Sequence, residues 1–200
     1  QPSLAKRLLQ AGLSTPTPVQ QAAIPVALEG RDIMAQAKTG SGKTLAFLLP
    51  IIEQVMRREA SVPAPGPYVK SAGPSHSSGP KFLVLAPTRE LALQIEMELR
   101  KYAPASVTSM SVYGGTPIER QYRALQRPPL VVVGTPGRLL DLAGSGHLKL
   151  GGVTFLVMDE ADQMLDRGFL RDIQRIIRLL PAERQTLLFS ATFSGDIQTL

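Results

Sequence analysis

Short, almost purely apolar runs alternate along this chain with longer segments whose apolar residues recur at helical spacing, and this alternation constrains the fold more than any other feature. Near-continuous Val, Ile, Leu and Phe in the runs predicts strands buried on both faces, as in a parallel sheet covered by helices. The predicted strands are 32–37, 81–87, 106–114, 129–135, 153–159 and 185–192. The predicted helices are about 17–28, 43–58, 89–102, 117–126, 136–143 and 169–179. We therefore predict an α/β fold with a doubly wound, mostly parallel sheet flanked by helices.

Composition narrows the class of protein. With 200 residues, 44% of them hydrophobic, the chain is long enough for one compact domain with a substantial core. No stretch approaches the roughly 18 consecutive apolar residues of a membrane span, and no signal-peptide pattern opens the chain, so no membrane partner is expected. The absence of cysteine excludes disulfides and fits an intracellular protein whose compartment stays open. A formal charge of +6 favours polyanionic partners such as nucleic acid.

One segment departs from the alternating pattern. Residues 58–81, REASVPAPGPYVKSAGPSHSSGPK, are rich in Pro, Gly and Ser. Such a composition buries too little apolar surface to order itself. We interpret the segment as a flexible surface insertion within the domain.

A phosphate-binding loop follows the first predicted strand, at the carboxyl end where parallel sheets bind their ligands. Residues 37–44, AKTGSGKT, fit the pattern G-x-x-x-x-G-K-[ST], except that Ala37 occupies the first glycine position and therefore needs a negative φ. The two glycines let backbone N–H groups face a β-phosphate, while Lys43 adds charge and the Thr44 hydroxyl can coordinate magnesium. The alternative is a glycine-rich turn that only caps a helix, and the order of strand, loop and helix argues against it.

Three carboxylates, Asp159, Glu160 and Asp162, follow the fifth predicted strand. A phosphate loop needs a metal-holding carboxylate at the end of a neighbouring strand, and Asp159 supplies one. Glu160 is then placed to orient and deprotonate the attacking water. Because clustered acids repel one another, we expect magnesium and a basic residue in the space between them. The alternative is that these acids cap the N-terminus of the next helix.

Several further motifs occur in the order typical of the DEAD-box ATP-dependent RNA helicases, a family that this sequence resembles over essentially its whole length. GLSTPTPVQ (12–20) resembles the Q motif, AQAKTGSGKT (35–44) motif I, PTRELA (87–92) motif Ia, Gly114 and Gly115 the GG element, TPGR (135–138) motif Ib, DEAD (159–162) the motif that names the family, and SAT (190–192) motif III. The resemblance implies a RecA-like P-loop NTPase domain with ATP and Mg as cofactors and RNA as partner.

The resemblance also implies a role for each motif. Gln20 would read the adenine edge and select ATP over GTP. The implied nucleotide-binding residues are Leu13, Gln20, Ala37, Lys38, Thr39, Gly40, Ser41, Gly42, Lys43 and Thr44. The implied metal residues are Thr44 and Asp159, the catalytic residues Glu160, Lys43 and Asp159, and the coupling residues Asp162, Ser190 and Thr192. The implied RNA-binding residues are Pro87, Thr88, Arg89, Gly114, Gly115, Thr135, Pro136, Gly137 and Arg138.

The RNA-binding assignment has a physical basis in the residues themselves. Arg89 and Arg138 follow strand ends and offer charged forks to phosphate oxygens, beside the hydroxyls of Thr88 and Thr135. Neighbouring glycines let backbone N–H groups approach a sugar-phosphate chain closely. Such contacts imply little sequence specificity. The alternative is that these segments are helix starts with Thr as N-cap, and both interpretations can hold together.

Two departures from the family pattern qualify the resemblance. Leu13 stands where the family usually carries Phe, and an upstream aromatic residue expected to stack on adenine would precede Gln1, so nucleotide affinity is expected to be reduced. Motifs of a second domain, including an arginine-bearing HRxGR segment, are missing. We expect residues 1–200 to be the first RecA-like domain of a longer protein, with little or no activity alone. Its expected partners include a second RecA-like domain of the same polypeptide and accessory proteins of unknown identity.

These observations predict one half of a helicase that couples ATP binding and hydrolysis to RNA binding and to local duplex unwinding or remodelling of an RNA–protein particle. Two alternatives share the same motifs. One is an RNA clamp or assembly scaffold that seldom turns over. The other is a DNA helicase or another P-loop ATPase.

Overall fold

A six-stranded sheet forms the centre of the molecule in the computed structural model, which describes residues 4–61, 79–193 and 195–198. The strand order is β1-β6-β5-β2-β4-β3, and every pairing is parallel. The strands are β1 (Ile33–Gln36), β2 (Phe82–Leu85), β3 (Ser109–Val112), β4 (Val131–Gly134), β5 (Phe155–Met158) and β6 (Gln185–Ser190). Leu85 lies opposite both Gly134 and Met158, so neighbouring strands end level with one another.

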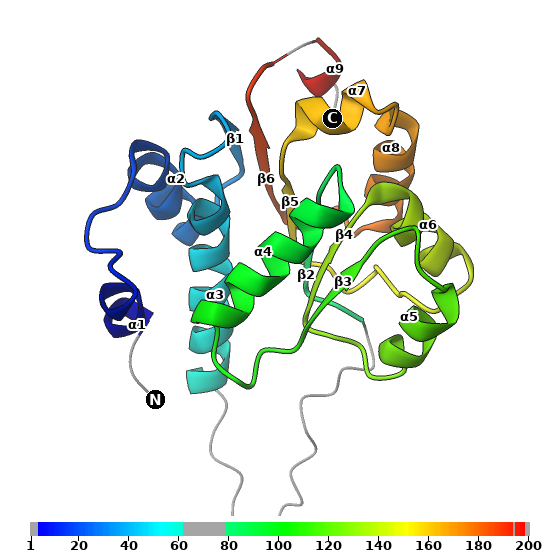
Figure 1. Ribbon diagram of the computed structural model, residues 1–200, viewed down its shortest axis with the longest axis horizontal. Helices are drawn as coiled ribbons and strands as arrows, with labels where there is room; N and C mark the ends of the chain where they lie inside the picture. The colour runs from blue at the N-terminus through cyan, green and yellow to red at the C-terminus, as the bar shows by residue number, and fades with distance from the viewer. Residues whose placement is uncertain (1–3, 62–78, 194, 199–200) are drawn as a thin grey trace, which may run out of the picture.

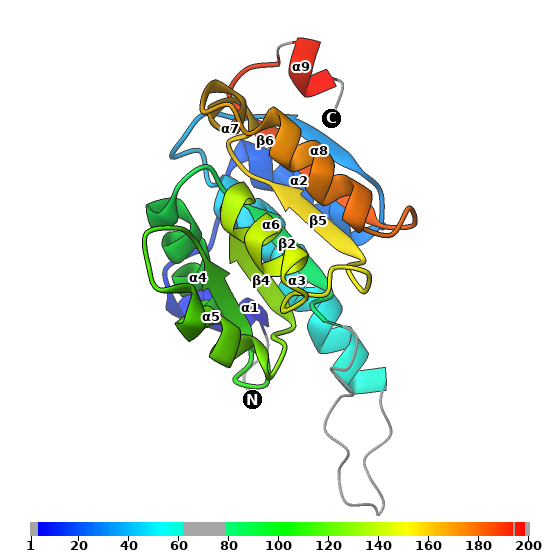
Figure 2. The ribbon, with the colours of Figure 1, turned by 90° about the vertical axis from the view of Figure 1, so that its right-hand side faces the viewer.

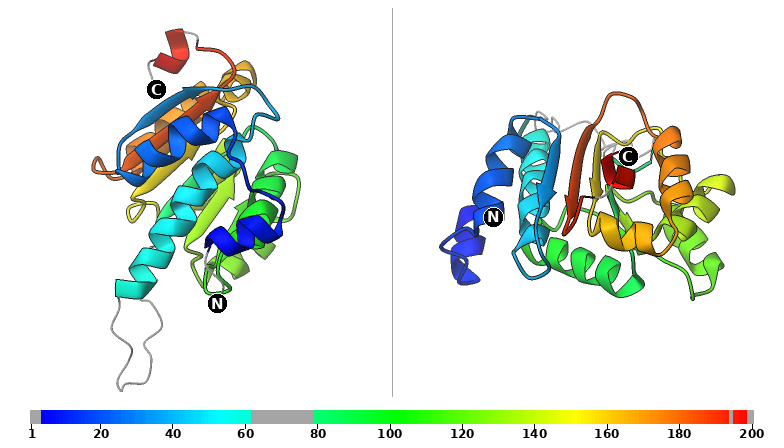
Figure 3. Two further views of the ribbon diagram at one scale, coloured as in Figure 1. Left: turned by 90° about the vertical axis from the view of Figure 1, so that its left-hand side faces the viewer. Right: turned by 90° about the horizontal axis from the view of Figure 1, so that it is seen from above.

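Helices cover both faces of this sheet (Figures 1, 2 and 3). One core contains Phe82 and Val84 together with residues of the first helices, and the other contains Leu83 and Leu85 together with residues of the later helices. The helices of the first layer are α1 (Leu4–Gln10), α2 (Pro18–Leu28), α3 (Lys43–Ser61) and α4 (Arg89–Tyr102). Those of the second layer are α5 (Ile118–Leu125), α6 (Pro136–Gly144), α7 (Ala161–Asp166), α8 (Leu170–Leu179) and α9 (Gly195–Gln198). Because successive residues of a strand face opposite sides, the near-continuous apolar runs supply both cores.

The predicted fold class is confirmed, and each of the six predicted strands contains one observed strand. Three helices were not predicted: α1, α7 and α9, which have 7, 6 and 4 residues. Helices this short carry too few turns for a helical period to show in the sequence. Among the described residues, no helix is both long and apolar enough to cross a membrane.

The segment predicted as a flexible insertion, 58–81, needs one correction. Helix α3 continues to Ser61, so the first residues of that segment are helical. Arg, Glu and Ala, which occupy positions 58–60, are good helix formers and extend the helix in spite of the Pro and Gly that follow. Residues 62–78 lie outside the described residues.

Candidate functional site

The loops that carry the sequence motifs meet at one edge of the sheet. Because all six strands are parallel, their carboxyl ends lie on the same side, where the loops after β1, β2, β3, β4, β5 and β6 emerge. In Figure 1 this edge is the upper one, with α7 above β5 and the start of α3 beside β1. Motifs spread over most of the sequence therefore share one surface.

The phosphate loop depends on two glycines in the left-handed region. Gly40 has φ +80° and Gly42 has φ +92°. A Cβ on Gly42 would lie 2.6 Å from Gln20 Nε2 and 2.8 Å from Thr17 Oγ1, so this position has no room for a side chain. Ala37 does not have a positive φ. Alanine can therefore occupy the first glycine position of the motif without backbone strain.

Gln20 connects the start of α2 to this loop. Its Nε2 donates to the Gly42 carbonyl oxygen at 3.1 Å, and its Oε1 accepts from the Thr17 backbone N–H at 3.0 Å. Both contacts fix the orientation of the amide, which is buried. One N–H and one lone pair of the amide are left for a ligand. Leu13 is exposed and does not line the adjacent groove.

Lys43 lies between two of the predicted carboxylates. Its Nζ is 3.8 Å from Asp159 Oδ1 and 3.9 Å from Glu160 Oε1. Lys43 and Asp159 are 6% and 2% exposed, so this pair is almost entirely removed from water. Burial raises the pKa of the Asp159 carboxyl to about 6, against the opposing effect of the Lys43 charge, and Glu160 adds to the rise. Burial therefore makes ionisation of Asp159 less favourable than that of an exposed aspartate, and the Lys43 charge offsets part of this effect.

Glu160 has an unusual backbone conformation. Its φ of 52° and ψ of 52° are left-handed, and it is the one non-glycine residue of positive φ in the described ranges. Left-handed backbone costs such a residue about 1–2 kcal/mol. Its carboxylate accepts a hydrogen bond from Thr39 Oγ1 at 3.1 Å and makes no capping bond to α7, although Glu160 is the N-cap residue. The Glu160 side chain thus faces the phosphate loop, contrary to the helix-capping interpretation for this residue, whereas Asp162 Oδ1 accepts from the Gln163 backbone N–H in the first turn of α7.

Asp162 faces a different part of the site. Its Oδ2 accepts from the Ala191 backbone N–H at 3.2 Å and from Thr192 Oγ1 at 3.4 Å. Its own backbone N–H donates to Ser190 Oγ at 3.2 Å. The three predicted coupling residues are therefore in contact. The expected basic residue is Lys43, whose ion pairs among the described residues are with Asp159 and Glu160 and not with Asp162, and magnesium between the acids stays a prediction. Asp162 lies in the first turn of α7, and its Oδ2 contacts the loop after β6.

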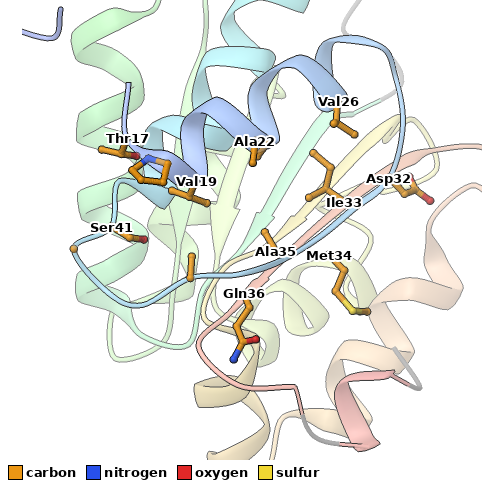
Figure 4. Close-up of a pocket in the computed structure, with 14 residues that line it drawn as sticks. Thr17, Val19, Ala22, Val26, Asp32, Ile33, Met34, Ala35, Gln36 and Ser41 are labelled. Atoms are coloured by element: carbon orange, nitrogen blue, oxygen red, sulfur yellow. The ribbon is translucent and has the colours of Figure 1, made fainter. Parts of the chain in front are cut away.

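Two depressions adjoin the phosphate loop. The smaller, of about 400 Å³, is lined by Lys43, Thr44, Asp159 and Glu160, and α4 contributes Gln94 and Glu98 to its lining. The larger is an open groove of about 850 Å³ between α2 and β1. Figure 4 shows Val19, Ala22 and Val26 on one wall and Ile33, Ala35 and Met34 on the other, with Thr17 and Ser41 at the end next to the loop. The groove is mainly apolar, with Asp32 as the ionisable residue among those that line it, whereas the smaller cavity is lined by Lys43, Asp159 and Glu160.

The donor set in the smaller cavity fits magnesium. A hydroxyl from Thr44 and a carboxylate from Asp159 are hard oxygen ligands, and Mg²⁺ in phosphate sites typically takes one or two protein ligands plus phosphate and water oxygens. Among the described residues, no three His, Cys, Asp or Glu side chains gather closely enough to form an all-protein metal cage. The site is thus suited to a metal that arrives with a phosphate.

The loops after β2 and β3 form a second part of the edge. The hydroxyl of Thr88 accepts from the Leu91 backbone N–H at 3.2 Å and so caps α4, which the helix-start interpretation predicted. Arg89 is exposed, and its guanidinium carbon lies 4.8 Å from the centre of the Tyr113 ring. Gly114 and Gly115 are exposed as well. Arg89 and the two glycines are accessible to a ligand.

The loop after β4 is arranged differently from the prediction. Arg138, on α6, has only 11% of its side chain exposed. Its two terminal nitrogens each lie 3.2 Å from the Thr116 carbonyl oxygen, and Nε lies 3.8 Å from an Asp141 carboxylate oxygen. Arg138 therefore supports a loop and does not present a free fork to solvent. Thr135 is the N-cap residue of α6 without a side-chain capping bond.

The remaining predicted residues are distributed along the same edge. Pro87 and Pro136 are buried, Gly137 is half-buried, and Lys38 is exposed on the phosphate loop. Sequence reasoning missed Thr17, Thr116 and Gln121, whose contacts hold the loops in place. For Gln121 a sequence signal was available, because it is a polar residue within the apolar stripe of α5.

Comparison with known proteins agrees with this geometry. Residues 17–200 match the profile of the family described as DEAD/DEAH box helicase. The sequence is 47% identical over 198 residues to a probable ATP-dependent RNA helicase, ddx17, of Dictyostelium discoideum, covering 98% of this chain and 24% of the relative. It is 45% identical over 201 residues to the mitochondrial DEAD-box ATP-dependent RNA helicase 9 of Arabidopsis thaliana, covering 100% of this chain and 30% of the relative.

A solved structure is also similar. The crystal structure of a hypothetical ATP-dependent RNA helicase from Sulfolobus tokodaii superposes with a TM-score of 0.81 at 34% identity. The match covers 98% of this chain and 52% of that chain. This chain thus spans about a quarter to a half of the length of these similar proteins.

Proposed function

This chain belongs to the DEAD/DEAH box helicase family, and from that premise we propose that residues 1–200 are the ATP-binding half of an ATP-dependent RNA helicase. The observation that carries the proposal is the burial of Lys43 between Asp159 and Glu160 beside a glycine-bent phosphate loop. A lysine held within 4 Å of two carboxylates leaves surplus negative charge around it, and the magnesium ion that accompanies a nucleotide supplies positive charge to such a site, while Lys43 faces the phosphates.

The residues of the smaller cavity divide the ATPase chemistry among them. Backbone N–H groups of the loop and Lys43 Nζ bind the β- and γ-phosphates. Thr44 and Asp159 hold magnesium, which when bound neutralises charge on the phosphates. Glu160, kept on the loop side of β5 by its left-handed backbone and by Thr39, orients the attacking water and accepts its proton.

The adenine end of the nucleotide belongs at the junction of α2 and the phosphate loop. Gln20 retains one N–H and one lone pair there, which matches the donor and acceptor of the adenine edge. GTP presents the reverse pattern on its base, so Gln20 favours adenine. The nearby end of the groove at Thr17 and Ser41 provides the adjoining surface.

The second part of the edge is the RNA-binding surface in this proposal. Arg89, Gly114 and Gly115 are exposed and contact the sugar-phosphate backbone, with little selection among bases. The contacts among Asp162, Ser190 and Thr192 couple the two parts of the edge. We also propose a second RecA-like domain in the same polypeptide, since the reported relatives are roughly three to four times longer than their matched part.

The test uses the full-length protein. ATP hydrolysis is measured with single-stranded RNA and with DNA of the same sequence, and calorimetry compares binding of Mg-ADP with that of Mg-GDP. We expect RNA to stimulate hydrolysis more than DNA and ADP to bind in preference to GDP. Equal stimulation by DNA would favour a DNA helicase, and binding of GDP as tight as that of ADP would remove the assignment of Gln20. Strand separation with repeated turnover distinguishes a helicase from a clamp.

A further inference from the structure

We propose that Gln121 and Arg138 act as positioning residues for RNA binding by clamping the loop of residues 113–117, here called the glycine loop. The inference rests on the proposed function, because it concerns how the RNA-binding surface is held in place. The glycine loop carries the exposed Gly114 and Gly115 between β3 and α5. Its flanking residues, Tyr113 and Thr116, receive every contact that makes up the clamp.

Gln121 joins the two ends of the glycine loop through its side-chain amide. It lies one turn into α5, is 7% exposed, and uses one nitrogen for two contacts. Nε2 donates to the Tyr113 carbonyl oxygen at 3.0 Å and to Thr116 Oγ1 at 2.9 Å. These two acceptors stand on either side of the glycine pair, so a single amide group fixes the distance between the ends of the loop. Both amide hydrogens are used in doing so.

Two arginines hold the same flanking residues from neighbouring helices. Arg138 of α6 directs both terminal nitrogens at the Thr116 carbonyl oxygen, and Arg89 of α4 lies over the Tyr113 ring. Charged donors make the stronger hydrogen bonds, and the low exposure of Arg138 protects them from competition by water. Three helices thus converge on the two residues next to the glycines.

The glycines themselves are left open. A Cβ built on Gly114 or Gly115 meets no other atom within 4 Å, and Gly115 has φ +78°. The loop therefore combines exposed backbone with pinned ends. Unpinned glycines have the largest conformational freedom of any residue, and a ligand that binds their backbone must restrict it. A clamp that restricts it beforehand raises affinity without touching the ligand.

The variant that tests this is Gln121→Leu in the full-length protein. Leucine fills a similar buried volume but leaves the Tyr113 carbonyl oxygen and Thr116 Oγ1 without their donor. We expect the Kd for single-stranded RNA, measured by fluorescence anisotropy, to rise about tenfold, the loss typical of one or two buried hydrogen bonds. The RNA concentration that half-saturates ATP hydrolysis should rise equally, while kcat at saturating RNA changes by less than about twofold.

Gln185→Leu is the matched control. Gln185 is 8% exposed, and like Gln121 it donates from Nε2 to two acceptors, here the backbone oxygens of Ala27 at 2.9 Å and Arg31 at 2.7 Å. These contacts fix the connection between α2 and β1, at the opposite end of the sheet from the glycine loop. The control should lower Tm as Gln121→Leu does, yet leave the Kd for RNA unchanged. Equal RNA affinity in the two variants would overturn the clamp and reduce Gln121 to a structural residue.

Thr116→Val provides a second route that perturbs folding less. It removes the Oγ1 acceptor while keeping the Thr116 carbonyl oxygen for Arg138. In the clamp, the effects of Thr116→Val and Gln121→Leu on RNA affinity are not additive, because both changes break the same contact. Fully additive effects contradict it. If the unaltered full-length protein fails to bind RNA, the proposed function and the clamp fail together, whereas RNA binding that is insensitive to Gln121 removes the clamp alone.

Discussion

The hydroxyl of Thr39 donates a hydrogen bond of 3.1 Å to the carboxylate of Glu160, across the space between the phosphate loop and the end of β5. Among the described residues, the other contact that holds this carboxylate over the loop is its ion pair with Lys43. The left-handed backbone of Glu160 is the other half of the arrangement, because it turns the side chain away from the axis of α7. A strained backbone maintained at this position points to a requirement for one orientation of the carboxylate.

Glu160→Gln in the full-length protein should therefore abolish most hydrolysis while preserving ATP binding. Glutamine keeps the size and can still accept from Thr39, but it cannot take a proton from water. General-base catalysis typically contributes about 10²–10⁴-fold, so kcat should fall by that order with Kd for ATP little changed. Asp166→Asn, an exposed carboxylate at the end of the same helix, is the control and should hydrolyse ATP normally. Normal turnover by the Glu160→Gln variant would contradict the assignment of Glu160 as the general base.

Thr39→Val tests orientation separately from proton transfer. The change removes the hydroxyl that donates to Glu160 and leaves the carboxylate in place. Since a hydrogen bond to a charged group is worth about 1.5–3 kcal/mol, we expect kcat for RNA-stimulated hydrolysis to fall by roughly tenfold to a hundredfold. Thr39→Ser restores the hydroxyl and should recover most of the rate. A serine variant as slow as the valine variant would show that the hydroxyl is not what matters.

Much of the fold was predictable because its signal is local. Strands such as β4 and β5 are apolar at every position and buried at every position, so a sequence run of Val, Leu and Phe indicates them directly. The strand order was not predictable in this way, because β6 pairs with β1 from the far end of the sequence. Helix α7 was missed because its six residues show one turn and a half of pattern.

The residues of the candidate site show the same contrast between local sequence signals and contacts made over a long sequence distance. Residues that act through their chemical type, such as Lys43 and Asp159, were identified from motif spacing and are brought together by the structure. Residues that act through a distant partner were either missed, as Gln121 was, or given a different role, as Arg138 was. Gln121 has the sequence appearance of a misplaced polar residue, and Arg138 that of a free cation, until the carbonyl oxygens they bind are known. Backbone acceptors carry no sequence signature, so their partners escape pattern reasoning.

Gly42→Ala should disrupt the phosphate loop more than its backbone angle alone explains. A methyl group there meets Gln20 Nε2 at 2.6 Å and Thr17 Oγ1 at 2.8 Å, and would displace the start of α2. Gly146→Ala is a matched control, because Gly146 has a similar φ of +76° but nothing within 4 Å of a built Cβ. Both variants should lose about 1–2 kcal/mol of stability from the left-handed backbone. Only Gly42→Ala should also lose Mg-ADP binding in calorimetry, and equal binding by both would show that α2 accommodates the methyl group.

The buried Asp159 carboxyl predicts an unusual pH dependence of folding stability in the absence of metal. Burial raises its pKa from 3.8 to about 6 in the folded chain. Between these values the unfolded chain has released the proton and the folded chain still binds it, so the free energy of unfolding must fall as pH rises. A shift of about two units corresponds to roughly 3 kcal/mol, fully present below about pH 4 and lost as pH rises through 6.

Asp159→Asn removes this titration, because an amide does not ionise. Urea unfolding of both proteins in a chelator, from pH 4 to pH 7, should show the unaltered protein losing up to about 3 kcal/mol relative to the variant. Asp166→Asn, at an exposed position, should follow the unaltered protein throughout. Adding magnesium and ADP should reverse the trend near pH 7, since ligands that require the ionised carboxylate stabilise the folded chain where that form exists. Parallel profiles for the unaltered protein and Asp159→Asn would mean that Lys43 keeps Asp159 ionised despite its burial.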